Sequence, residues 1–128
     1  MTRFAVPLLL LTALATTGAT QHLDRYEQAK FDTTLAGLKP GAPQHCIRRD
    51  RVTELLPFGD TILFREGRGK LWRNDLASRC MGLQRGDRAI VESAGMRYCG
   101  GDPVRSRNPV GGAITGMCRL GDFVPYSK

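Results

Sequence analysis

The sequence predicts a small, mainly β domain, an antiparallel barrel or sandwich with a short N-terminal helix and two disulfides. Three observations support this fold class. The 128 residues, 41% of them hydrophobic, suit one globular domain. Short runs of strand-forming residues recur between glycines and prolines over residues 46–128. The four cysteines also lie within this range, which we assign to the β domain.

The first segment has the pattern of a secretory signal peptide. Arg3 supplies a positive charge, residues 4–15 are largely apolar, and small residues follow at 17–19. We predict cleavage after Ala19, so residues 1–19 form the signal peptide, with a cut at residues 13–15 as the alternative. A retained membrane anchor is disfavoured because spanning a bilayer takes about 20 apolar residues. The mature protein is therefore expected to be periplasmic or secreted.

Residues 20–45 predict a helical arm followed by a linker. Apolar residues recur at roughly helical spacing over residues 20–38, with charged residues between them. Pro40 and Pro43 then end the helix, because proline cannot extend it and disfavours helical geometry in the residue before. The sequence leaves open whether this arm packs on the domain or serves as a spacer.

An even number of cysteines in an exported chain predicts two structural disulfides. Zinc and redox sites use closely spaced cysteine pairs, whereas neighbouring cysteines here are 34, 19 and 19 positions apart. Four cysteines allow three pairings, and the sequence alone does not choose among them. We favour Cys80 with Cys99, which would staple a loop, and Cys46 with Cys118, which would join the first strand to the last.

The strand signals fall into three pairs, each separated by turn-forming residues. The predicted pairs are residues 61–65 with 70–73, 89–92 with 96–99, and 103–107 with 113–120. The apolar residues of 47–56 follow neither the helical nor the strand period well, and we assign this segment to a strand.

The dipeptide Gly-Asp occurs four times, with its aspartates at Asp60, Asp87, Asp102 and Asp122. Calcium loops place several oxygen ligands close together in sequence, whereas these aspartates are at least 15 positions apart. Glycine and aspartate are both common in turns. The dipeptides therefore predict turns, and we expect no metal site.

The sequence shows no catalytic or cofactor-binding signature. His22 and His45 are the only histidines, and no G-x-S-x-G motif presents a serine nucleophile. The glycines of 67–69 lack the following helix that a phosphate-binding loop requires. A pair of carboxylates in one pocket depends on spatial proximity alone, so a small hydrolase stays open as an alternative.

Arginine is the feature that favours binding. Nineteen Lys and Arg stand against twelve Asp and Glu, and fifteen of the nineteen are Arg. Arg48, Arg49 and Arg51 cluster after Cys46 and form the candidate anion-binding group, because guanidinium groups bind phosphate and carboxylate in a forked geometry. Acidic residues interleave with the arginines, so an ordinary solvated surface is the alternative. Nucleic acid is disfavoured, because an exported protein meets little of it.

Four large rings are assigned to the core because a domain of this size needs them for burial; they are Phe64, Trp72, Tyr98 and Phe123. A ligand groove lined by these rings is the alternative.

Scattered residues resemble a family of small exported bacterial cysteine-containing proteins of unassigned function. The residues are Cys46-Ile47, Thr61-Ile62-Leu63-Phe64, Leu76 to Cys80 with Gly82-Leu83, Cys99 with Asp102, and Cys118 with Leu120 and Phe123. The resemblance implies a compact β-rich domain with stabilising cysteines. It implies no activity and no catalytic residue.

The sequence thus predicts a non-catalytic, envelope-associated binding or structural module, whose partner is an anionic envelope component or another exported protein. Two alternatives stay open. One is an inhibitor that inserts a loop near residues 80–99 into an extracytoplasmic hydrolase, and the other is a small hydrolase.

Overall fold

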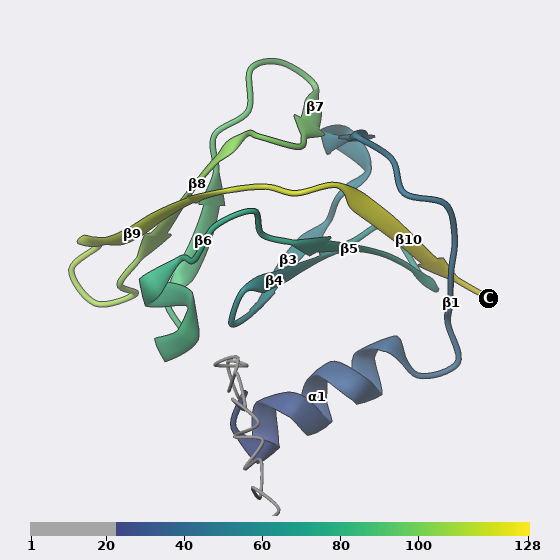
Figure 1. The fold of residues 1–128 in the computed structure, drawn as a ribbon, viewed down its shortest axis with the longest axis horizontal. Coiled ribbons are helices and arrows are strands. Elements are labelled where there is room, and N and C mark those ends of the chain that lie inside the picture. The colour runs from purple at the N-terminus through teal and green to yellow at the C-terminus, as the bar shows by residue number, and fades with distance from the viewer. Residues whose placement is uncertain (1–22) are drawn as a thin grey trace, which may run out of the picture.

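The computed structural model describes residues 23–128, so the predicted signal peptide at residues 1–19 lies outside the described residues (Figure 1). The described chain is mainly β, with one α-helix, two short 3-10 helices and antiparallel strand pairs throughout. The strands form three separate sheets of five, two and three strands. The predicted barrel is therefore wrong for the described residues, because the sheets do not join into one closed ring of strands.

The five-stranded sheet has the spatial order β1-β10-β5-β4-β3. Its strands are β1 (Lys39–Pro40), β10 (Phe123–Ser127), β5 (Lys70–Asp75), β4 (Thr61–Arg65) and β3 (Glu54–Phe58). The predicted hairpin of residues 61–65 with 70–73 is confirmed, and Phe64 lies opposite Trp72. Gly67 and Gly69 in its loop have φ values of 61° and 78°, which explains the need for glycine there.

The three-stranded sheet has the order β6-β8-β9, with β6 (Arg88–Val91), β8 (Pro103–Arg107) and β9 (Ile114–Arg119). Pairing of β8 with β9 confirms the predicted hairpin of residues 103–107 with 113–120.

The two-stranded sheet pairs β2 (Cys46–Arg48) with β7 (Arg97–Cys99). The predicted hairpin of residues 89–92 with 96–99 is therefore wrong, because β6 pairs with β8 and β7 pairs with the distant β2. The predicted strand over 47–56 is also broken, since the 3-10 helix η1 (Arg49–Arg51) separates β2 from β3.

The core lies where the three sheets meet. It contains Ile47, Ile62, Phe64, Trp72, Cys80, Leu83, Val104, Cys118, Leu120 and Phe123. Phe64 is at its centre, with ring centroids 5.4 Å from Tyr98 and 5.2 Å from Phe123. The assignment of these rings to the core is confirmed for Phe64, Trp72 and Phe123, while Tyr98 is partly buried and packs against the cluster.

Two disulfides are present, as predicted, but the favoured pairing is wrong. Cys46 is bonded to Cys99, and Cys80 is bonded to Cys118. Cys46 and Cys99 lie directly opposite each other on β2 and β7, so strand pairing brings their sulfurs together. Cys80 precedes the 3-10 helix η2 (Met81–Arg85) and is buried beside Val104, the residue opposite Cys118.

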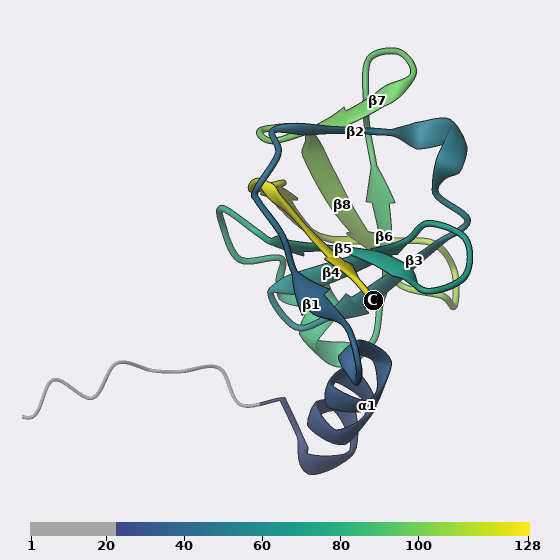
Figure 2. The ribbon, with the colours of Figure 1, turned by 90° about the vertical axis from the view of Figure 1, so that its right-hand side faces the viewer.

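The arm preceding the β domain contains the helix α1 (Arg25–Leu35), below the sheets in Figures 1 and 2. Asp24 caps it by accepting a hydrogen bond from the Glu27 amide at 2.8 Å. Phe31 packs edge-to-face on Phe58 of β3, with centroids 5.3 Å apart, so the helix contacts the sheet. The linker also takes part in the sheet, because β1 pairs with β10. Within residues 23–128 no helix is long and apolar enough to cross a membrane.

Candidate anion-binding groove

A groove of about 410 Å³ lies between the two-stranded sheet and the β4–β5 hairpin. Four cationic side chains line it, Arg48, Arg51, Lys70 and Arg97, together with one carboxylate, Glu66. Gln44, Cys46, Ile47 and Trp72 complete the lining. The groove therefore combines a strongly cationic lining with apolar walls from the edge of the core.

Arg48 and Arg97 are brought together by strand pairing. They lie directly opposite each other on β2 and β7, so their side chains share one face of this sheet. Like charges placed opposite each other repel, and an anion bound between them would relieve the repulsion. The Arg97 side chain makes no hydrogen bond or ion pair with any residue from 23 to 128, which leaves its guanidinium available for such an anion.

Arg48 is held by a neighbouring carboxylate. Its Nε and Nη2 donate to the two oxygens of Asp50 at 3.0 and 2.6 Å. This side-chain hydrogen bonding raises the pKa of Arg48 and lowers the pKa of Asp50. Asp50 does not line the groove, so the pair orients Arg48 without placing a second carboxylate inside.

Both carboxylate oxygens of Glu66 have a partner. Its side chain is only 16% exposed and lies 3.8 Å from Nη1 of Arg51, and the Trp72 indole donates a hydrogen bond to its other oxygen. Lys70 places its ammonium 4.5 Å from the centroid of the same indole, within cation–π range. Asp50 pairs with Arg48 from outside the lining and Glu66 pairs with Arg51, so Lys70 and Arg97 are the lining cations without a carboxylate partner among residues 23–128.

The structure brings two of the three predicted anion-binding arginines to this groove. Arg48 and Arg51 line it, whereas Arg49 does not. Arg49 instead lies 5.8 Å from the centroid of the Tyr98 ring, and its Nη1 donates to the Ser93 hydroxyl at 3.5 Å.

Sequence reasoning missed Arg97 and Lys70, because they join the groove through strand pairing and not through sequence proximity. One signal was available for Arg97. Arg48 follows Cys46 by two residues and Arg97 precedes Cys99 by two, so a disulfide between these cysteines in antiparallel strands places the arginines opposite each other.

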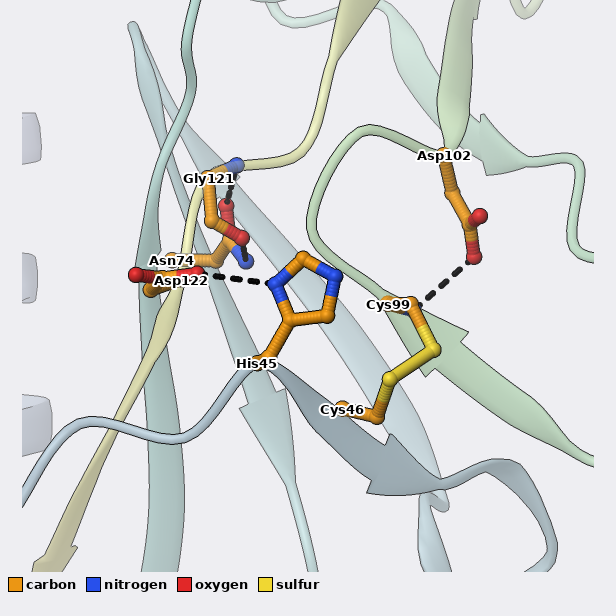
Figure 3. Close-up of polar contacts among 7 residues, drawn as sticks. All are labelled: His45, Cys46, Asn74, Cys99, Asp102, Gly121 and Asp122. Atoms are coloured by element: carbon orange, nitrogen blue, oxygen red, sulfur yellow. Dashed lines mark hydrogen bonds and ion pairs between the residues drawn. A yellow bond between two sulfur atoms is a disulfide. The ribbon is translucent and has the colours of Figure 1, made fainter.

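A second polar cluster surrounds His45, next to the Cys46–Cys99 disulfide (Figure 3). The His45 Nδ1 lies 3.2 Å from Oδ1 of Asp122, and both side chains are exposed. Asp102 accepts a hydrogen bond from the backbone N–H of Cys99 at 2.9 Å. The neighbouring sulfurs are bonded to each other, so neither is a nucleophile for His45 to activate.

The Gly-Asp dipeptides coincide with turns and loops. Gly59, Gly86 and Gly101 have positive φ, the backbone conformation that glycine adopts most easily. Within the part of the chain that the structure describes, no three His, Cys, Asp or Glu side chains form a group that fits a metal ion.

No family model matches the sequence, and neither curated proteins nor solved structures provide a match. The resemblance to small exported bacterial proteins therefore stays a prediction. The fold and the site define the chain as a disulfide-linked, mainly β domain with a cationic groove.

Proposed function

We propose that this protein is an exported, non-catalytic binding module that takes an anionic group, a carboxylate or a phosphate, into the groove beside the Cys46–Cys99 disulfide. The observation that carries the proposal is Arg97, whose side chain lies opposite Arg48 and has no partner among the described residues. The lining around it contains four cations and one carboxylate, Glu66, which already lies beside Arg51. The two disulfides suit an oxidising compartment outside the cytoplasm.

The groove favours a ligand that carries its oxyanion on a larger skeleton. The Arg97 guanidinium presents its N–H donors to a phosphate or carboxylate, and Arg48 adds its Nη1 group, which does not contact Asp50. Ile47 and Trp72 form apolar walls next to the charges, and contact with such walls adds binding energy for a bound organic group. With Glu66 as the single lining carboxylate, the groove lacks the pair of acids that glycoside cleavage uses.

Trp72 provides a direct test, because it is the only tryptophan and it lines the groove. We expect titration with inorganic phosphate, and separately with glucuronate, to change its fluorescence saturably. Arg97→Gln should weaken the affinity about 10- to 100-fold, because a hydrogen bond to a charged group contributes about 1.5–3 kcal/mol.

Arg25→Gln on the exposed face of α1 is the matched control, since it removes the same charge outside the groove. It should bind both probes like the parent protein. Emission that responds to the probes no more than to sodium chloride at equal ionic strength would contradict the proposal. Equal affinity of the Arg97→Gln and parent proteins would contradict it as well.

A second candidate function, inhibition of an extracytoplasmic hydrolase, rests on the loop between β6 and β7. This loop projects from the top of the molecule in Figures 1 and 2, and its exposed Met96 immediately precedes β7. The Cys46–Cys99 disulfide ties β7 to β2 at the base of the loop. An apolar side chain on an anchored loop is the kind of group that enters an enzyme cleft.

We expect an inhibitor of this kind to slow a lysozyme-class glycosidase or a trypsin-class protease in a substrate-cleavage assay. Met96→Asp should then abolish inhibition, while Met81→Asp, an exposed methionine on η2, should leave it unchanged. Absence of inhibition of both enzyme classes, or equal inhibition by the Met96→Asp variant, counts against this candidate.

A further inference from the structure

The outer face of the three-stranded sheet carries a regular arrangement of arginines and apolar side chains. Strand register places Ile90, Arg105 and Met117 in one row across β6, β8 and β9. Arg88, Arg107 and Ile114 form a second row, in which a β-bulge between Ser106 and Arg107 shifts the register so that Ile114 lies opposite Arg107. Because directly opposite residues project to the same side of a sheet, these six residues share one face, which we call the arginine face.

Burial confirms which side is outward. The alternate residues of these strands point inward, and Val104, Ser106 and Cys118 among them are buried. On the arginine face, Ile90, Ile114 and Met117 are 40%, 48% and 63% exposed. The face is therefore not covered by any described part of the chain.

The arginine face has a clear excess of positive charge. Glu92 pairs with Arg105 at 2.9 Å. Arg88 and Arg107 make no ion pair with any residue between 23 and 128. Arg119, next to Pro103 at the end of the sheet, donates to the Gly101 carbonyl at 2.8 Å and has no carboxylate partner among the described residues.

Apolar groups continue from this face onto the adjoining loop. Residues 108–113 connect β8 to β9, and Val110 on this loop is 84% exposed. Its backbone N–H is held by the Asn108 side chain at 2.8 Å, which gives the loop a defined turn. Val110, Ile114 and Met117 thus lie on one connected loop and strand, beside the unpaired cations of β6 and β8.

We propose that the arginine face docks on an anionic lipid bilayer. Lipid phosphates would complement Arg88 and Arg107, while Ile114, Met117 and Val110 would enter the boundary between headgroups and acyl chains. Arginine suits this position because its apolar stem packs along the boundary while its charged end stays in the headgroup layer. None of these residues lines the groove, so this proposal does not depend on the proposed function.

The distribution of the apolar groups favours a bilayer over an acidic protein. Protein interfaces concentrate their binding energy in a few anchors that fill pockets of the partner. Here the exposed aliphatic groups are spread over two rows and a loop, with arginines between them, which matches a fluid surface without fixed pockets. A second copy of the chain is disfavoured, because two positively charged faces repel each other.

Vesicle co-sedimentation of the disulfide-bonded protein tests the proposal. We expect binding to vesicles of phosphatidylglycerol mixed with phosphatidylcholine, weaker binding as salt rises, and little binding to phosphatidylcholine alone. The double variant Arg88→Gln/Arg107→Gln should lower the partition coefficient about 25-fold, the product of about fivefold for each arginine near the membrane surface.

Two further variants separate charge from apolar insertion. The control Arg25→Gln/Lys30→Gln removes the same charge from the exposed helix α1 and should bind vesicles within about twofold of the parent. Ile114→Ser/Met117→Ser keeps every charge and should still lower vesicle binding at least fivefold, because methylene groups leave the acyl boundary. Circular dichroism establishes that each variant is folded.

Three results would overturn the proposal. The first is no binding to phosphatidylglycerol vesicles, or equal binding to both vesicle types. The second is a double arginine variant that binds like the α1 control. The third is an Ile114→Ser/Met117→Ser variant that binds vesicles like the parent, which would show that no apolar side chain enters the acyl boundary.

Discussion

Replacing Cys80 and Cys118 together with alanine is expected to lower the free energy of unfolding by about 4 kcal/mol. Their disulfide closes a loop of 38 residues, and cross-linking a chain over that length restricts the unfolded state by about this amount. Both cysteines are buried in the core, so their removal also costs packing. Since domains of this size are stable by only about 5–15 kcal/mol, much of the margin would be lost.

Urea denaturation followed by Trp72 fluorescence measures this loss. The double variant Cys46→Ala/Cys99→Ala provides the comparison. Its disulfide closes a loop of 53 residues, but both cysteines are half-buried and lie outside the core. We expect this second pair to lower stability by a similar entropic amount, about 4 kcal/mol. It should in addition weaken phosphate binding, since it releases Arg97 from its position opposite Arg48. An unchanged urea midpoint for the Cys80→Ala/Cys118→Ala variant would contradict the expectation.

Asn74→Ala is expected to cost about 4 kcal/mol. Asn74 is fully buried on β5, where its side-chain amide donates to the Gly121 carbonyl and its side-chain oxygen accepts from the Gly121 N–H, both at 2.8 Å (Figure 3). Alanine would leave the N–H and the carbonyl of half-buried Gly121 without these partners, and each unsatisfied group away from water costs about 1–3 kcal/mol. No side chain can replace Gly121 in this pair without movement, because a Cβ there would collide with the carbonyl of Asp75.

Asn108→Ala is the matched control for this prediction. Asn108 also bonds backbone through its side chain, but it lies in an exposed loop where water can take over the lost bond. We expect it to lower the free energy of unfolding by less than about 1 kcal/mol in the same urea experiment. Equal destabilisation by the two alanine variants would show that burial of Asn74 is not the cause.

The parts of the fold that local sequence decides are the parts that could be predicted. Hairpin β4–β5 has strand formers on both sides of a glycine loop, and β8–β9 shares this pattern. Pairing of β6 with β7 could not be excluded from sequence, because the competing partner β2 lies about 50 residues away in the chain. The predicted cysteine pairing was wrong for the same reason, because the spacing of cysteines in the sequence does not show which strands pair.

In the candidate site too, residues close in sequence could be predicted, whereas residues brought together by strand pairing could not. Arg48 and Arg51 are close in sequence, and their cluster alone identified them. Arg97 enters the groove only because β7 pairs with β2, and Lys70 only because the β4–β5 hairpin faces that pair. The outward register of Ile90, Arg105 and Met117 likewise required the strand order of the folded sheet.

The position of β10 constrains when the molecule can fold. It is the last strand along the described chain, yet it lies between β1 and β5 and supplies Phe123 to the core. During synthesis the earlier strands emerge first, and β1 has no partner in the sheet until residues 123–127 arrive. The five-stranded sheet is therefore completed only after β10 has been synthesised, and until then β1 and the β5 edge that β10 covers stay unpaired.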